Sequence, residues 1–204
     1  MSAPGTARLE ADLRHYLRSK SALFSSQFSE VIADVITFTS AVVRHGFRIA
    51  LARLASHGTV LPDRPFIQVC EAIVEHHVRL VRTAERELVG KSLYEAYIHL
   101  AGPQHVFRPA TTTRFTHSLR RHGVKSFAAS FLSLHLFNVV CLEIRDDIAA
   151  KMADQQSVEL YMFGMEAMCR DIVAHAMKIP DGGLDKQWAA AICSNIEGQL
   201  LHWS

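Results

Sequence analysis

The residues of this 204-residue chain best suited to chemistry are twelve histidines and several carboxylates spaced one helical turn apart. Four pairs have the i, i+4 spacing of metal ligands on a helix: Glu71/Glu75, Glu95/His99, Asp171/His175 and Glu143/Asp147. Such pairs projecting inward from four helices would resemble a di-metal bundle. The sequence contains no Glu-x-x-His, His-x-x-x-His or His-Glu-x-x-His motif, however. The pairs are therefore interpreted as exposed helix-face residues, and metal ligation is kept as the alternative.

Two imidazoles stand among apolar neighbours. His77 lies on the apolar stripe of a predicted helix, and His135 lies within Phe-Leu-Ser-Leu-His-Leu-Phe-Asn, with Asn138 one turn later. A buried polar group needs hydrogen-bond partners, because leaving it without one costs roughly 1–3 kcal/mol. We expect His135 and Asn138 to bond neighbouring groups and set the register of the bundle. The alternative is an internal pocket lined by His77, His135 and Asn138 that holds haem, a metal or a small apolar ligand.

The motifs of common catalytic sites are missing from the sequence. There is no Gly-x-Ser-x-Gly elbow, the ten glycines form no phosphate-binding loop, and the four cysteines form no Cys-x-x-Cys pair. The cysteines are expected to be free, buried thiols in a reducing compartment. No catalytic residue, metal site or cofactor is predicted, and the chain is interpreted as a binding protein more readily than as an enzyme.

Charge is distributed unevenly along the chain. No Asp or Glu occurs between Glu95 and Glu143, and five cationic residues lie in that window: Arg108, Arg114, Arg120, Arg121 and Lys125. A basic segment without compensating acids favours an anionic partner. The alternative is a solvated basic face that pairs with the acidic C-terminal half, within the molecule or between subunits. The net charge of +2 is small for a dedicated nucleic-acid binder, so nucleic acid is not the favoured partner.

A long apolar segment is expected to organise the elements that carry these residues. Residues 124–150 are apolar nearly all round in their first half, which is typical of a helix buried in the middle of a bundle. The remaining helical periods and the lack of strand-like alternation predict an all-α, single-domain bundle of about seven helices over residues 1–204. Residues 1–5 are expected to be a loose tail.

Local signals divide the rest of the chain. Gly46 is expected to kink or divide a long helix over residues 22–56. Asp63 is a candidate N-cap for a helix that ends at Gly90, and Ser92-Leu-Tyr-Glu95 matches a capping box that would open a short helix through Leu100. Residues 103–113, which contain two prolines and three threonines, are predicted to be an irregular loop.

No membrane span is predicted, because no stretch reaches about 18 apolar residues without strongly polar interruptions. The N-terminal twenty residues lack the apolar core of a signal peptide. A cytoplasmic location is therefore expected.

Two stretches resemble the Bcl-2 family of helical apoptosis regulators. Leu80-Val-Arg-Thr-Ala84-Glu85 is similar to the Leu-x-x-x-Gly-Asp core of the family's BH3 helix, and His122-Gly123-Val124 is similar to the approach to its BH1 region. This chain departs from the family's Asn-Trp-Gly-Arg signature, which is replaced by Lys125-Ser126-Phe127-Ala128. The resemblance covers about twenty residues and implies a divergent Bcl-2-like regulator as a third hypothesis.

The favoured hypothesis is a helical binding or regulatory protein that contacts a protein partner or an anionic ligand and forms a homodimer. The second hypothesis is a helical sensor or enzyme with haem, metal or an apolar ligand inside the bundle. On the first hypothesis the basic segment 108–125 carries the partner contacts, each arginine acting as a charge-assisted donor.

Overall fold

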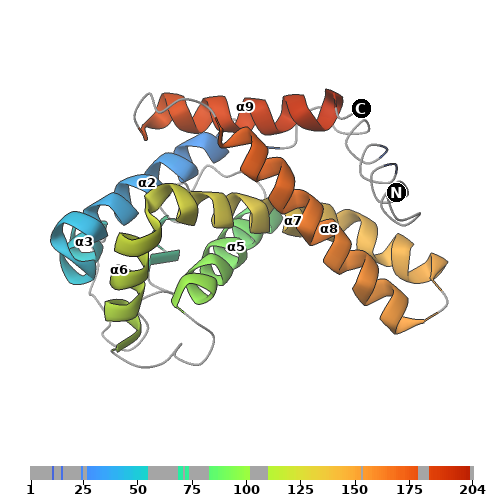
Figure 1. Ribbon diagram of the computed structural model, residues 1–204, viewed down its shortest axis with the longest axis horizontal. Helices are drawn as coiled ribbons and strands as arrows, with labels where there is room; N and C mark the ends of the chain where they lie inside the picture. The colour runs from blue at the N-terminus through green and yellow to red at the C-terminus, as the bar shows by residue number, and fades with distance from the viewer. Residues whose placement is uncertain are drawn as a thin grey trace.

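The chain folds into an α-helical bundle (Figure 1). The computed structural model describes residues 11, 15, 24, 27–54, 69–70, 72–73, 83–101, 110–152, 154–178 and 184–202. Within these residues there are seven helices: α2 (Phe28–His45), α3 (Phe47–Leu54), α5 (Thr83–Ala101), α6 (Ala110–His122), α7 (Val124–Lys151), α8 (Gln155–Ala176) and α9 (Lys186–His202). The predicted all-α bundle of about seven helices is confirmed for this described part of the chain.

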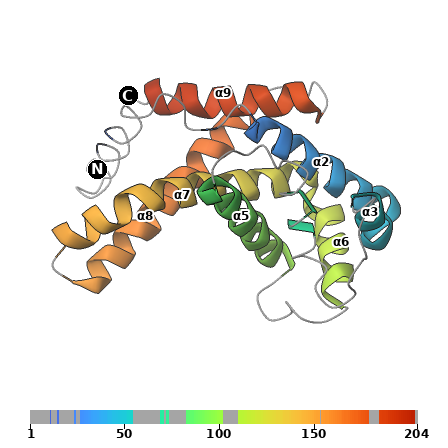
Figure 2. The ribbon, with the colours of Figure 1, turned by 180° about the vertical axis from the view of Figure 1, so that it is seen from behind.

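Helix α7 is the axis of the bundle. It packs against α2, α5, α6 and α8, and both ribbon views show α5 and α8 crossing it while α6 meets its start (Figures 1 and 2). Large apolar side chains of its first half are buried, among them Phe127, Phe131, Leu132, Leu136 and Val140. Because neighbours cover it on several sides, apolar residues can stand all round this helix. The buried central helix predicted over residues 124–150 is confirmed as Val124–Lys151.

Two glycines with positive φ turn the chain between successive helices. Gly46 separates α2 from α3 and Gly123 separates α6 from α7, each with φ of 86°. Residues with a Cβ rarely adopt this conformation, whereas glycine does so without steric cost. The amide of Gly46 donates to the carbonyl of Val42 at 2.9 Å, and that of Gly123 donates to Leu119 at 2.8 Å, so each glycine ends one helix before the next begins. The division expected at Gly46 is confirmed.

The capping box predicted at Ser92–Glu95 is wrong. Helix α5 runs without interruption from Thr83 to Ala101, through Gly90, and the Ser92 hydroxyl donates to the Leu88 carbonyl at 2.6 Å instead of capping a new helix. A glycine inside a helix costs only about 1 kcal/mol relative to alanine. The neighbouring Val89 and Leu93 are fully buried, and their packing offsets that cost.

The irregular loop predicted over residues 103–113 is wrong at its C-terminal end. Residues 110–113 form the first turn of α6, while 103–109 lie outside the described residues. Threonine can satisfy its hydroxyl within a helix by bonding to the carbonyl one turn earlier. Thr116 does so here, donating to the Thr112 carbonyl at 2.8 Å.

One stretch of the described residues, Val124–Leu142 in α7, is long and apolar enough to cross a membrane. Half of that window is buried within the protein. A central helix of a bundle has the same length and composition, and its position among α2, α5, α6 and α8 accounts for them here.

The second half of α7 and the first half of α8 extend away from the rest of the bundle (Figure 1). Helix α8 begins at a well-formed N-cap, because the Asp154 carboxylate accepts from the Ser157 amide at 2.7 Å and from the Ser157 hydroxyl at 2.9 Å. Hydrogen bonds to the charged carboxylate lower the pKa of Asp154. We call residues 142–152 and 154–163 the α7–α8 end.

Candidate functional site

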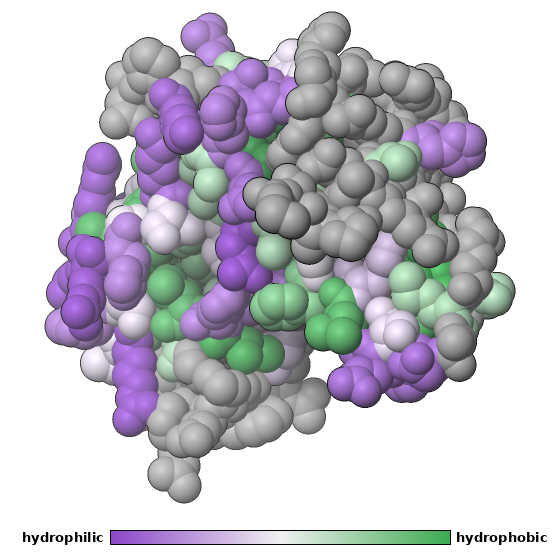
Figure 3. All heavy atoms as spheres, turned by 45° about the vertical axis from the view of Figure 1, so that its right-hand side comes forward, coloured by the Kyte–Doolittle hydropathy of each residue, from purple (hydrophilic) through white to green (hydrophobic). Residues whose placement is uncertain are grey.

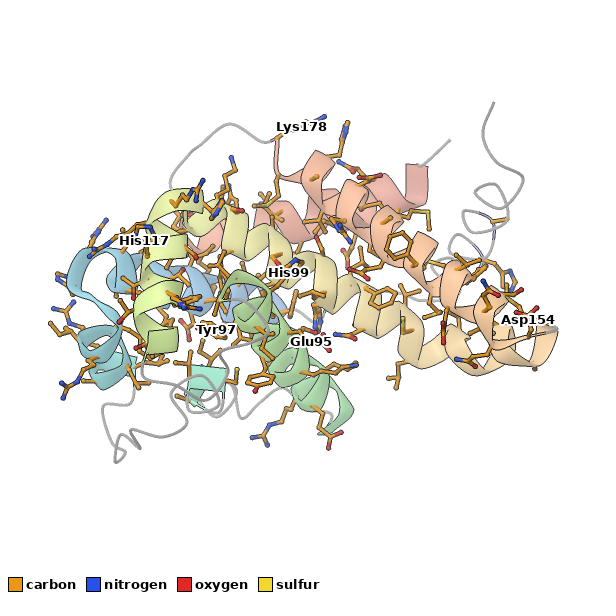
Figure 4. The ribbon with its side chains drawn as sticks, turned by 60° about the horizontal axis from the view of Figure 1, so that its bottom comes forward. Glu95, Tyr97, His99, His117, Asp154 and Lys178 are labelled. Carbon is orange, nitrogen blue, oxygen red and sulfur yellow. The ribbon has the colours of Figure 1, made fainter. Side chains whose placement is uncertain are left out.

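A cleft of about 920 Å³ lies at the opposite side of the molecule, where α3 and the end of α2 meet α6. It is open to solvent on one side, and Figure 4 shows His117 at this end of the bundle. We call it the α3–α6 cleft. Its lining consists of His45, Gly46, Phe47, Arg48, Ile49, Ala52, Arg53, Thr112, Thr113, Thr116, His117 and Arg120.

The cleft joins two acid-free segments of the chain. Residues 35–62 and residues 96–142 contain no Asp or Glu, and α3 belongs to the first segment while α6 belongs to the second. Three arginines line the cleft, Arg48 and Arg53 from α3 and Arg120 from α6, and among the described residues no carboxylate lines it. Helix packing therefore concentrates positive charge that the sequence distributes over two distant regions.

The arginines of the cleft stand above an apolar base. Arg48, Arg53 and Arg120 are exposed, whereas Phe47 beneath them is buried. Ile49, which follows Arg48 in α3, is 50% exposed. The surface thus combines guanidinium groups, threonine hydroxyls and an accessible aliphatic side chain.

Aromatic packing fixes the two walls of the cleft. The ring of Phe47 in α3 meets Phe115 of α6 edge-on at 6.0 Å between centroids, and it meets Phe38 of α2 edge-on at 5.7 Å. The ring centroid of Phe115 in turn lies 4.8 Å from that of Tyr97 and 5.5 Å from that of Phe127. Edge-to-face contacts of this kind add roughly 0.5–1.5 kcal/mol each beyond the burial of their surface. The arginines are therefore carried on helices held by core side chains.

Arg120 has a structural contact besides its place in the cleft. Its Nη2 donates to the carbonyl of Val43 in the last turn of α2 at 3.3 Å. A cation near the C-terminus of a helix is favourable, because the last carbonyls lack helical partners. Arg120 therefore connects α6 to the end of α2 and keeps its guanidinium at the rim of the cleft.

The five predicted cationic residues do not gather at one place. Arg120 lines the cleft, Arg114 and Arg121 are exposed on α6 without lining it, and Lys125 is half-buried in the first turn of α7. Arg108 lies outside the described residues. Arg48 and Arg53 were missed, although the acid-free segment 35–62 was a signal available in the sequence.

His135 and Asn138 lie in a second polar group, buried between α5 and α7. Asn138 Nδ2 donates to Ser92 Oγ at 3.0 Å and to Glu95 Oε2 at 2.9 Å, and His135 Nδ1 lies 3.5 Å from Ser92 Oγ. Glu95 also faces Lys91 at 3.8 Å, and Figure 4 shows Glu95 beside α7. We call these four residues, Ser92, Glu95, His135 and Asn138, the buried polar cluster; the first, third and fourth are buried, and the Glu95 side chain, 36% exposed, forms its solvent-facing edge.

Phenylalanines surround the imidazole of His135. Its ring stacks on Phe28, with 4.2 Å between the ring centroids. The centroids of Phe24 and Phe131 lie 6.2 and 6.1 Å away. Burial lowers the pKa of His135 to about 3, opposed only in part by the Leu88 carbonyl. The imidazole is therefore neutral at physiological pH, and its neighbours hold it in the core.

The predicted internal pocket of His77, His135 and Asn138 stays a prediction, because only two of its three members are among the described residues. His77 lies outside the described residues, and the α3–α6 cleft includes neither His135 nor Asn138. Among the described residues no three His, Cys, Asp or Glu side chains are grouped to hold a metal ion. The expected role of His135 and Asn138, bonding across helices, matches the contacts of the buried polar cluster.

Three of the four cysteines, Cys70, Cys169 and Cys193, are buried as expected. Burial raises the pKa of the Cys169 thiol strongly and that of Cys193 to about 12. The thiolate is the nucleophilic form of cysteine, so these two side chains are poor nucleophiles at neutral pH.

Comparison of this chain with protein-family models, curated proteins and solved structures finds no match.

Proposed function

We propose that this protein works by binding, and that the α3–α6 cleft is the site at which it takes an acidic protein partner. The observation that carries the proposal is the composition of the cleft: three arginines, two histidines and three threonines line it, and no carboxylate in the described part of the chain does. Guanidinium groups bind carboxylates through paired hydrogen bonds, and such charge-assisted bonds are stronger than neutral ones.

The apolar part of the cleft favours a protein partner over nucleic acid. Ile49 and Ala52 are both exposed and lie three residues apart on α3, so they form an apolar strip beside Arg48. An aliphatic strip matches the apolar side of an amphipathic helix, whereas a nucleic-acid surface is read mainly through its phosphates. The net charge of +2 points the same way, because it adds little general attraction for a polyanion.

The expected partner is therefore a helical segment with carboxylates on one side and an aliphatic or aromatic residue between them. Its carboxylates would meet Arg48, Arg53 and Arg120, and its apolar residue would cover Ile49. Exposed ion pairs contribute only roughly 0.2–1 kcal/mol each. Affinity would thus depend on several pairs together with the burial of Ile49, and it would fall as salt screens the charges.

Fluorescence anisotropy with a labelled amphipathic helical peptide built of Glu and Leu tests this proposal. The wild-type protein should bind the peptide, and Arg48→Ser with Arg53→Ser should weaken binding roughly tenfold, the sum of two moderate ion pairs. Arg114→Ser with Arg121→Ser is the matched control, because it removes the same charge from the same end of the molecule but outside the cleft.

Two results would overturn the proposal. One is equal loss of binding in both double variants, which would mean that general positive charge and not the cleft attracts the peptide. The other is tighter binding of a labelled DNA duplex than of the peptide at the same salt concentration, which would assign the cleft to nucleic acid.

A further inference from the structure

We propose that the acidic partner of the α3–α6 cleft is the α7–α8 end of a second copy of this chain, so that the protein assembles head to tail. This inference rests on the proposed function, because it names the occupant of the same cleft. Three features of the molecule support it: complementary charge, complementary apolar surface and the position of the two surfaces at opposite ends.

The two ends of the molecule carry opposite charge. The segments that form the cleft end, residues 35–54 and 110–125, contain seven Lys and Arg and no Asp or Glu. The α7–α8 end contains five Asp and Glu and two Lys and Arg, a net charge of −3. Asp154 and Glu159 in this end are exposed at the start of α8. Opposite potentials on two surfaces steer them together and disfavour pairing of either surface with itself.

The α7–α8 end also exposes large apolar side chains. Leu160 is 65% exposed and Phe163 is 68% exposed, and these two residues are one helical turn apart on α8. In Figure 3, which turns this side of the molecule forward, hydrophobic residues reach the surface between hydrophilic ones. With Glu159 beside them, Leu160 and Phe163 have the chemistry expected of the segment that fills the cleft: a carboxylate next to an aliphatic and an aromatic anchor.

A chain cannot fill its own cleft with its own α7–α8 end. The cleft lies at one end of the long axis and the start of α8 lies at the other, and Figure 4 shows His117 and Asp154 at these opposite ends (Figures 1 and 4). Because α7 is one continuous helix between the two ends, the contact must be made between molecules. Because the two surfaces differ, each added copy leaves one cleft and one α7–α8 end available, and assembly continues until a ring closes.

Complementation between two variants tests this geometry. Arg48→Glu with Arg53→Glu removes the cleft and keeps the α7–α8 end, and Leu160→Ser with Phe163→Ser does the reverse. All four residues are exposed, so both variants should keep the wild-type fold, as circular dichroism can check. Sedimentation velocity at rising concentration should show the wild type growing beyond a dimer, with association weakened at least about tenfold between 50 and 500 mM salt.

Each variant alone should stay monomeric, and an equal mixture of the two should form a dimer and nothing larger. That dimer has one intact cleft, on the Leu160/Phe163 variant, filled by the intact α7–α8 end of the Arg48/Arg53 variant. Arg114→Glu with Arg121→Glu should still assemble like the wild type, because these side chains stand outside the cleft.

Other outcomes would overturn the inference in distinguishable ways. A wild type that stays monomeric would remove head-to-tail assembly, and it would leave the proposed function standing if the Glu/Leu peptide still binds the cleft. A cleft variant that dimerises alone would indicate a symmetric contact through α8. A mixture that stays monomeric would show that the two surfaces do not meet.

Discussion

The buried polar cluster and the α3–α6 cleft use similar residue types in opposite ways. In the cluster, Asn138 and Ser92 bond to each other and to neighbouring groups across α5 and α7, so the polar atoms are satisfied inside the molecule. In the cleft, Arg48 and Arg53 are exposed over an apolar base, and none of the carboxylates that the structure describes lines the site. The comparison separates polar residues that hold the fold from polar residues that are available to a partner.

Electrostatics explains why the two groups behave differently. A buried polar atom loses its hydration and must regain it from protein groups, which fixes its neighbours in one arrangement. An exposed arginine stays hydrated and needs no partner in the folded chain. Changes in the cluster should therefore alter stability, and changes in the cleft should alter binding.

The largest effect is expected from Asn138→Asp, which places a buried carboxylate beside that of Glu95. Asn138 now donates to Glu95 Oε2 at 2.9 Å, and the aspartate would replace this bond with repulsion between like charges. An uncompensated buried charge costs roughly 3–5 kcal/mol, so the free energy of unfolding should fall by about that amount at pH 7.

Urea denaturation followed by circular dichroism measures this loss. Asn138→Leu, which has a similar volume and no charge, is the control and should lose only about 1–2 kcal/mol, since Ser92 keeps its bond to Leu88. Equal losses in the two variants would contradict the role assigned to charge.

A smaller effect is expected from acid, through His135. Its pKa is about 3 in the folded chain against an ordinary value of 6.5, so between these pH values only the unfolded chain binds a proton at this imidazole. Stability from this group is therefore complete above pH 6.5 and is lost as the pH falls. From pH 7 to pH 5 the loss is about 2 kcal/mol.

His135→Phe removes the titrating group and keeps an aromatic ring among Phe24, Phe28 and Phe131. Its free energy of unfolding should fall about 2 kcal/mol less than that of the wild type over the same interval, the other histidines contributing equally to both. If the free energies of unfolding of the two proteins changed equally with pH, water or a charge would reach the imidazole of His135, and the prediction would be wrong.

The smallest change in stability is expected in the cleft. Arg48→Ser with Arg53→Ser should alter the free energy of unfolding by less than about 0.5 kcal/mol, since both side chains are exposed. Thermal and urea unfolding compared with the wild type measure this directly. A loss above about 1 kcal/mol would mean that the arginines support the fold, and the contrast with the buried polar cluster would fail.

The axis of the fold could be predicted from sequence because its signals are local. The apolar run of α7 and the division at Gly46 depend on a few neighbouring residues, and both are confirmed. The capping-box prediction was wrong because Ser92 and Glu95 lie inside one continuous helix, α5, and accept hydrogen bonds from Asn138, which lies more than forty residues later in the chain. The neighbouring sequence cannot distinguish a serine and a glutamate that cap a helix from a pair that bonds to another helix.

The candidate site could be predicted only in half. Arg120 lies in a segment without Asp or Glu, which can be recognised in the sequence. The other two arginines of the cleft, Arg48 and Arg53, belong to α3, more than sixty residues earlier. Their meeting depends on the packing of Phe47 against Phe115, which is a tertiary contact. Charge counted along the chain shows that a basic surface exists, and helix packing decides which arginines share it.

The most direct test of the account is to locate the bound anionic partner on the protein. Two-dimensional ¹H–¹⁵N NMR of the labelled Leu160→Ser, Phe163→Ser variant, which keeps the cleft and does not assemble, reports on each backbone amide as the Glu/Leu peptide is added. We expect the shifts to gather at the end of α2, along α3 and on the cleft side of α6, around Arg48, Arg53 and His117. Shifts centred on α8 and α9, or shifts unchanged in the Arg48→Ser, Arg53→Ser variant, would contradict it.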